Sequence, residues 1–126
     1  MTKKINVLLL DNSERITFRI EFMLLNNKII ESVKIAHTIG WAKEILREMK
    51  TDVVILDIKF SDGDGMDFLS QLKKSYPKIN LVVLTNHADD YHKIYAKKLG
   101  ANYFIDKSMA FQEIPNVLTQ ILSSIT

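Results

Sequence analysis

Five short apolar runs recur along the chain, and each is followed by polar residues and then by a longer segment with the spacing of a helix. Four of the runs are almost continuously apolar, which is typical of parallel strands buried on both faces. The run at 32–37 instead alternates apolar and polar residues, which favours a strand at the edge of a sheet. The predicted strands are 5–10, 32–37, 53–56, 80–85 and 103–105.

The segments that follow these strands carry apolar residues three and four positions apart, which predicts amphipathic helices. Ser13 and Thr38 stand where the N-caps of the first and second helices are expected. Pro77 and Gly100 end the third and fourth helices, because the residue before proline avoids helical angles and glycine adopts left-handed ones. Pro115 fits the last helix only within its first turn, where its missing N–H is not needed.

This strict alternation predicts an α/β protein in which a doubly wound, five-stranded parallel sheet carries helices on both faces. With right-handed crossovers, the flavodoxin-like strand order 2-1-3-4-5 puts the run at 32–37 on an edge. The same order makes the first and third strands neighbours, so Asp11 and Asp57 are expected side by side. Their common end lies at the topological switch point, where this fold class binds ligands.

The amino-acid composition limits the possible classes of protein and of binding partner. With 126 residues, 47% of them hydrophobic and 25% charged, the chain fits one globular domain over residues 1–126. A net charge of +2 is too small to indicate binding to nucleic acid or to an anionic membrane. The chain has no cysteine, which excludes disulfides and thiolate metal sites, and its apolar runs are only strand-sized. A cytoplasmic location is the simplest expectation.

The predicted sheet gathers polar side chains at one end. Asp11, Asn12 and Asp57 converge there with no cation expected between them, and adjacent carboxylates repel unless a proton or a metal neutralises them. Oxygen donors without cysteine or histidine favour Mg²⁺ or Mn²⁺ over Zn²⁺. Thr85 and Lys107, at the ends of the fourth and fifth strands, add a hydroxyl and an ammonium. Such a set is suited to forming and holding an acyl phosphate on aspartate.

In this order the residues resemble the receiver domain of two-component response regulators, and the resemblance extends over the whole chain. It rests on Leu10-Asp11-Asn12, Asp57 with Gly65, Thr85, and Gly100-Ala101 leading to Phe104 and Lys107. The resemblance implies that Asp57 accepts a phosphoryl group from a histidine kinase or a phosphotransfer protein. It implies a regulatory domain whose only chemistry is its own phosphorylation and dephosphorylation, not an enzyme.

The resemblance also implies the Mg²⁺ ligands, which are Asp11, Asn12, Asp57 and the backbone carbonyl of Lys59. Asn12 stands where the family usually has a second acid, so the site has one negative charge fewer and should bind Mg²⁺ more weakly. This departure leaves open a pseudo-receiver that acts by protein interaction without phosphorylation. A metal-dependent phosphatase is a further alternative, but Lys59 stands where its general acid is needed.

Further roles follow from the same resemblance. Thr85 and Lys107 are expected to contact the phosphoryl group, and Lys59 and His87 to flank it. Thr85 and Phe104 are expected to act as the switch that reports phosphorylation to the surface around the fourth helix, the fifth strand and the fifth helix. A downstream effector, an output domain absent from this chain or a second copy of the chain is expected there. Direct binding to nucleic acid is not expected.

Several other patterns favour structural roles. The Gly/Asp-rich segment 62–65 resembles a calcium loop only superficially and is interpreted as a turn and a helix start. Tyr91 and Tyr95, four residues apart, are expected to be half-buried by packing. His37 is expected to be a surface or edge histidine. No DNA-binding helix pair follows Thr126, so a single-domain regulator and the receiver of a longer protein both remain possible.

Overall fold

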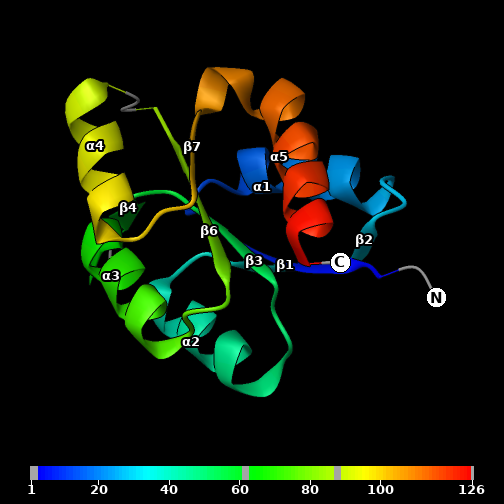
Figure 1. Cartoon of the computed structure of the whole chain (residues 1–126), viewed down its shortest axis with the longest axis horizontal. Coiled ribbons are helices and arrows are strands. Elements are labelled where there is room, and N and C mark those ends of the chain that lie inside the picture. The colour runs from blue at the N-terminus through cyan, green and yellow to red at the C-terminus, as the bar shows by residue number, and fades with distance from the viewer. Residues whose placement is uncertain (1–2, 61–62, 87–88, 126) are drawn as a thin grey trace.

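A computed structural model describes residues 3–60, 63–86 and 89–125 and contains one five-stranded parallel sheet (Figure 1). The strand order is β2-β1-β3-β6-β7, which confirms the predicted order once the two strands of a small separate hairpin are set aside. β2 lies at one edge, as its alternating pattern predicts. The five strands are β1 (Ile5–Leu10), β2 (Ile30–Ala36), β3 (Val53–Leu56), β6 (Asn80–Thr85) and β7 (Tyr103–Asp106).

Helices cover both faces of the sheet, as expected for a doubly wound fold (Figure 1). One face is packed by α1 (Glu14–Leu25) and α5 (Ala110–Ile125). The other face is packed by α2 (Ile39–Glu48), α3 (Gly65–Ser75) and α4 (Asp90–Leu99). Of the helices in the described part of the chain, none is both long and apolar enough to cross a membrane.

The two apolar layers explain why the central strands are continuously apolar. In β3, Val53 and Ile55 pack into the layer beneath α1 and α5, whereas Val54 and Leu56 pack into the layer beneath α2, α3 and α4. All four side chains are buried, because successive residues of a strand point to opposite faces and both faces are covered. The sheet is therefore a rigid support for the side chains at its strand ends.

The helix boundaries follow the predicted signals. The Ser13 hydroxyl accepts a hydrogen bond from the Ile16 N–H at 3.4 Å, and the Thr38 hydroxyl accepts one from the Trp41 N–H at 3.1 Å. Both serve as N-caps that satisfy free N–H groups of the first helical turn. Gly100 ends α4 with a φ of 119°, in the left-handed region where a side chain is strained.

The last helix begins earlier than predicted. A 3₁₀ turn at Lys107–Met109 leads directly into α5, so Pro115 is the sixth residue of that helix and not part of its first turn. The expectation that Pro115 lies in the first turn is therefore wrong. Proline lacks the N–H that bonds to the carbonyl four residues earlier in a helix, yet α5 continues past it with its apolar face packed against the sheet.

The segment after β3 contains a short antiparallel hairpin that the sequence pattern did not predict. Its strands are β4 (Lys59–Phe60) and β5 (Gly63–Asp64), and Lys59 pairs with Asp64. The Asp64 side chain accepts a hydrogen bond from the Met66 N–H at 2.9 Å and caps α3, which agrees with the predicted helix start. Two-residue strands carry no periodicity, which is why the hairpin was not visible in the sequence.

The outer side of α4 is more exposed than predicted. Tyr91 is 71% exposed and Tyr95 is 40% exposed, so the expectation that both are half-buried by packing is wrong. Ile94 lies on the same outer side and is 68% exposed. The helix packs against the sheet through the fully buried Ala96 and the partly buried Leu99, and the tyrosines lie on its exposed side. This helix therefore presents an apolar outer surface.

Candidate functional site

Four strand ends meet at one end of the sheet. Asp11 follows β1 and Asp57 follows β3, and these strands are paired up to Leu10 and Leu56. The Asp57 N–H donates to the Leu10 carbonyl at 3.0 Å, so the two acidic residues are held next to each other by the backbone. Thr85 ends β6 and Lys107 follows β7. The structure thus brings the side chains of Asp11, Asp57 and Lys107 into contact and places Thr85 at the end of a strand next to β3 and β7.

Lys107 lies between the two carboxylates. Its Nζ is 2.8 Å from Oδ2 of Asp57 and 2.9 Å from Oδ2 of Asp11, and its side chain is only 10% exposed. The expectation that no cation stands between the acids is therefore wrong. The long lysine side chain explains the difference, because it reaches across the end of the sheet from β7, which lies two strands from β3 and three strands from β1. The spacing of residues along the sequence does not report such a reach.

The charge state of Lys107 follows from this arrangement. Burial alone lowers the pKa of the ammonium, but the hydrogen bonds and charges of Asp57 and Asp11 outweigh it and raise the pKa above its ordinary value. Lys107 is therefore charged at neutral pH. The three groups together carry one net negative charge, so the site remains attractive to a cation.

Each carboxylate uses its other oxygen in a local hydrogen bond. Oδ1 of Asp11 accepts from the Ser13 N–H at 2.9 Å, and Oδ1 of Asp57 accepts from the Ile58 N–H at 2.6 Å. Oδ2 of Asp11 is fully buried and accepts no well-directed hydrogen bond from the described residues, although the Lys107 ammonium lies at ion-pair distance. An acceptor in this state can serve as a ligand or water acceptor when a cation enters.

Asp57 opens into a cavity of about 490 Å³ at the end of the sheet. The remaining wall comes from the segments that follow β1, β6 and β7, with one residue from α1. Six of the seven lining residues are polar or charged, and Thr85, the last residue of β6, is fully buried and does not line the cavity. The cavity can accommodate a hydrated cation together with a phosphoryl group. Its lining residues are Asn12, Ser13, Ile16, Asp57, Asn86, Lys107 and Ser108.

Two of the residues at this end were not assigned a role from the sequence. Asn86 lines the cavity directly after β6, and its position after a strand end was the available signal. His37, which follows β2, contacts the backbone of Asp11: its Nδ1 donates to the Asp11 carbonyl oxygen at 2.8 Å. The His37 ring also packs edge-on against Trp41. Because β2 is the edge strand, His37 is still the edge histidine that was expected, with the added contact to Asp11.

The other residues with an expected role are Lys59, Phe104 and His87, which are near Asp57, Lys107 and Thr85 in the sequence. Lys59 is in β4, two residues beyond Asp57, where its backbone pairs with Asp64. Phe104 is in β7, partly buried against the apolar layer of α2, α3 and α4, and pairs in register with Val83 of β6. His87 lies outside the described residues.

The donor set fits a hard cation. The described residues contain no group of three or more His, Cys, Asp or Glu side chains positioned to hold a metal. A cation would therefore be held by the carboxylates of Asp11 and Asp57 together with neutral oxygens such as the Asn12 amide. Mg²⁺ is commonly bound in this way, through one or two carboxylates with water and phosphate in the remaining positions. Oδ2 of Asp11 supports this fit, because it is buried and its neighbour at ion-pair distance is already a cation, the Lys107 ammonium.

The fold and the site define a class of protein: a flavodoxin-like α/β domain with an acidic pocket at its switch point. The sequence matches the profile of the "Response regulator receiver domain" family over residues 7–119. The chain therefore belongs to the receiver domains of two-component response regulators, a family of regulatory domains.

Individual relatives agree with this assignment. Fimbriae Z protein from Salmonella typhimurium is 29% identical over 121 residues, which is 96% of this chain and 58% of that protein. Response regulator protein VraR from Staphylococcus saprophyticus is 28% identical over 114 residues, which is 90% of this chain and 54% of that protein. The chain thus spans somewhat more than half the length of these curated relatives.

Solved structures share the fold. A CheY-like receiver domain from Methanospirillum hungatei matches with a TM-score of 0.87 and 20% identity, covering 97% of this chain and 96% of that one. RcsB from Salmonella typhimurium matches with a TM-score of 0.90 and 20% identity, covering 98% of this chain and 62% of that one. At this identity the likeness supports the fold alone.

Proposed function

We propose that the chain accepts a phosphoryl group on Asp57 from a histidine kinase or a phosphotransfer protein in the cytoplasm. The observation that carries this proposal is the Asp57 carboxylate, which opens into a polar cavity while Lys107 bridges it to Asp11. Membership of the receiver family supports the same role. The phosphatase alternative is not supported, because Lys59 stands at the position of its general acid.

The residues divide the chemistry between them. An oxygen of Asp57 attacks the phosphorus, the bond between phosphorus and the donor imidazole breaks, and the imidazole takes up a proton from solvent. Lys107 and the Thr85 hydroxyl offer positive charge and a hydrogen-bond donor to the phosphoryl oxygens, where negative charge is spread in the transition state. Ser13 and Ile58, through their N–H groups, orient the two carboxylates before transfer.

We also propose that Mg²⁺ is bound by Asp11, Asn12, Asp57 and the backbone carbonyl of Lys59. When bound, Mg²⁺ supplies the positive charge that lets the anionic donor approach the carboxylates. Asn12 is exposed at the rim of the cavity, so an Asn12→Asp substitution adds a negative charge without disturbing the core. We expect this variant to bind Mg²⁺ about tenfold more tightly, measured by isothermal titration calorimetry.

Intact mass spectrometry tests phosphorylation. The protein is incubated with acetyl phosphate and Mg²⁺, and we expect the mass of one phosphoryl group to be added. Asp57→Asn should abolish the adduct, while Asp67→Asn, at an exposed acid on α3, should leave it unchanged. An adduct retained by Asp57→Asn refutes the proposed acceptor. A wild-type protein that forms no adduct with any donor favours the pseudo-receiver.

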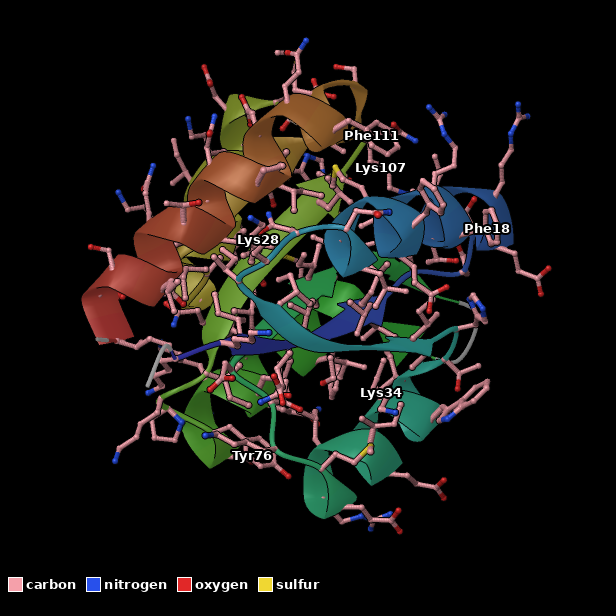
Figure 2. The ribbon with its side chains drawn as sticks, turned by 90° about the vertical axis from the view of Figure 1, so that its right-hand side faces the viewer. Phe18, Lys28, Lys34, Tyr76, Lys107 and Phe111 are labelled. Atoms are coloured by element: carbon pink, nitrogen blue, oxygen red, sulfur yellow. The ribbon has the colours of Figure 1, made fainter. Side chains whose placement is uncertain are left out.

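A phosphodonor protein must reach Asp57 across the rim of the cavity. Beside this rim, α1 exposes Phe18 and Phe22, and the start of α5 exposes Phe111, with the Arg19 guanidinium 4.5 Å from the Phe111 ring centre. In Figure 2 Phe111 and Lys107 lie close together in the upper part of the molecule, and Phe18 lies to their right on α1. We propose that this apolar surface receives the kinase or phosphotransfer protein. A Phe18→Ala variant should slow transfer from the protein donor but not from acetyl phosphate.

For the output we propose the surface formed by α4, β7 and α5. Thr85 and Phe104 lie on the adjacent strands β6 and β7, so movement of Thr85 toward a phosphoryl group can be passed to the Phe104 ring. The exposed Tyr91 and Ile94 offer an apolar contact for an effector, an output domain or a second copy of the chain. Phosphorylation should change the NMR chemical shifts of Phe104 and α4, and Thr85→Ala should suppress the change.

A further inference from the structure

The end of the molecule opposite Asp57 carries a groove that the proposed phosphorylation does not use. A cavity of about 210 Å³ lies between α2 and α3, and an adjoining cavity of about 450 Å³ lies between the segments that lead into β3 and β6. The two cavities share Leu46 and Tyr76. In Figure 2 Tyr76 lies at the lower end of the molecule and Lys107 at the upper end. We call these joined cavities the α2–α3 groove.

The floor of the α2–α3 groove is apolar. Leu46 and Leu72 are buried beneath it, the partly buried Tyr76 joins its two halves, and Met49 is 43% exposed at its side. α3 packs against α4 on its other side, so the groove lies on the side of α3 that faces α2. A groove of this shape between two helices has room for apolar side chains from another chain.

The rim of the same groove is strongly basic. Lys43, Arg47, Lys50 and Lys78 line it, all exposed, and none of the described residues that line either cavity is acidic. The acids of α2, Glu44 and Glu48, lie outside the groove. No ion pair within the described part of the chain involves any of the four cations. Among the described residues this positive rim has no ion-pair partner, although the Lys43 ammonium lies 6.0 Å from the centre of the Phe68 ring. The net charge of the whole chain is only +2.

We propose that the α2–α3 groove binds an acidic amphipathic helix of a partner protein. A helix presents apolar residues at i, i+3, i+4 and i+7, which match a trough between two helices, while acidic residues beside that stripe reach the basic rim. The charges steer association and set orientation, and the apolar contacts hold the complex. This site is at the opposite end of the sheet from Asp57 and does not depend on the phosphorylation proposal.

Two other occupants fit less well. A second copy of this chain, docked symmetrically through the same face, would set the basic rim against itself, because a two-fold interface pairs identical patches. Repulsion between like charges opposes that dimer. A nucleic acid would satisfy the cations through its phosphates, but its backbone brings no apolar side chains for the floor of the groove.

The test uses a fluorescent synthetic peptide of about 15 residues, the length at which isolated helices begin to form. Leucine occupies the i, i+3, i+4 and i+7 positions and glutamate most of the others. Fluorescence anisotropy with the full chain should show binding, and the Lys43→Glu/Arg47→Glu variant should bind at least about tenfold more weakly. The matched control is Lys28→Glu, an exposed lysine away from the groove (Figure 2), which should bind as the wild type does.

Three further samples make the result specific. A peptide with the same composition but shuffled leucines should bind weakly, and so should one with lysine in place of glutamate. Asp57→Asn should bind the original peptide normally, so failure of the phosphorylation proposal leaves this one intact. Circular dichroism checks that every variant is folded. Equal binding by the two charge variants, or tight binding of a single-stranded oligonucleotide but not of the peptide, overturns the proposal.

Discussion

Replacing Lys107 by methionine tests whether this lysine is what allows two carboxylates to lie side by side. In the wild type its Nζ is 2.8 Å from Asp57 and 2.9 Å from Asp11, and all three side chains are nearly buried. Removing one partner of a buried ion pair costs about 3 to 5 kcal/mol, because the remaining charge is left uncompensated. This is a large part of the roughly 5 to 15 kcal/mol that stabilises a domain.

The loss should be visible in urea denaturation followed by circular dichroism without metal. With a slope of about 1 to 3 kcal/mol per molar urea, the midpoint of Lys107→Met should fall by about 2 M. The matched control, Lys28→Met at an exposed lysine, should change the free energy of unfolding by less than about 0.5 kcal/mol. Equal stability of the two variants would refute the reasoning.

A second measurement on Lys107→Met tells whether its destabilisation comes from the lost positive charge or from lost side-chain packing. Mg²⁺ stabilises a protein to the extent that it binds the folded state better than the unfolded one. Because Lys107 occupies Oδ2 of both carboxylates, its removal frees those atoms for a cation. Added Mg²⁺ should therefore raise the urea midpoint more in Lys107→Met than in the wild type. No such difference would show that the destabilisation comes from lost packing.

The remaining predictions concern backbone, core and pH. Gly65→Ala should cost about 1 to 3 kcal/mol in the free energy of unfolding, because its Cβ would lie 2.5 Å from the Ile58 Cα. Leu56→Ala should cost about 2 to 5 kcal/mol by leaving a core cavity, measured by urea denaturation. Pro115→Ala should raise the melting temperature, since it restores a helical N–H. The pKa of Lys107 is raised by folding, so its charge contributes stability that is complete below pH 10.5, the ordinary lysine pKa, and is lost as the pH rises through the raised pKa of the folded state. The free energy of unfolding of Lys107→Met, measured against pH, should lack this alkaline loss.

Much of the fold could be predicted from the chain because its local patterns are strong. The continuous apolar run of β3 indicates burial on both faces, and the alternation at 32–37 indicates an edge, since side chains of a strand point to opposite faces in turn. The handedness of crossovers then makes β1 and β3 neighbours. The adjacency of Asp11 and Asp57 was therefore predictable from the sequence alone.

Contacts between side chains from distant segments were not predictable in this way. Lys107 stands between the carboxylates because a long side chain reaches across the end of the sheet, and His37 contacts the Asp11 carbonyl from the edge strand. Tyr91 and Tyr95 have the spacing of a packed stripe but face solvent, whereas Ala96 on the same helix is fully buried. The spacing of residues along a helix gives their relative direction, not which direction faces the core.

The α2–α3 groove is the clearest case of a feature that the sequence does not predict and the tertiary structure creates. Lys43 and Arg47 come from one helix and Lys78 from the approach to another strand, and along the chain each is an ordinary surface cation. Periodicity and strand ends are local properties, so they determine the elements, their order and the residues at the switch point. Distances between side chains, and which helix faces stay open, depend on how the elements pack, and only the tertiary structure decides them.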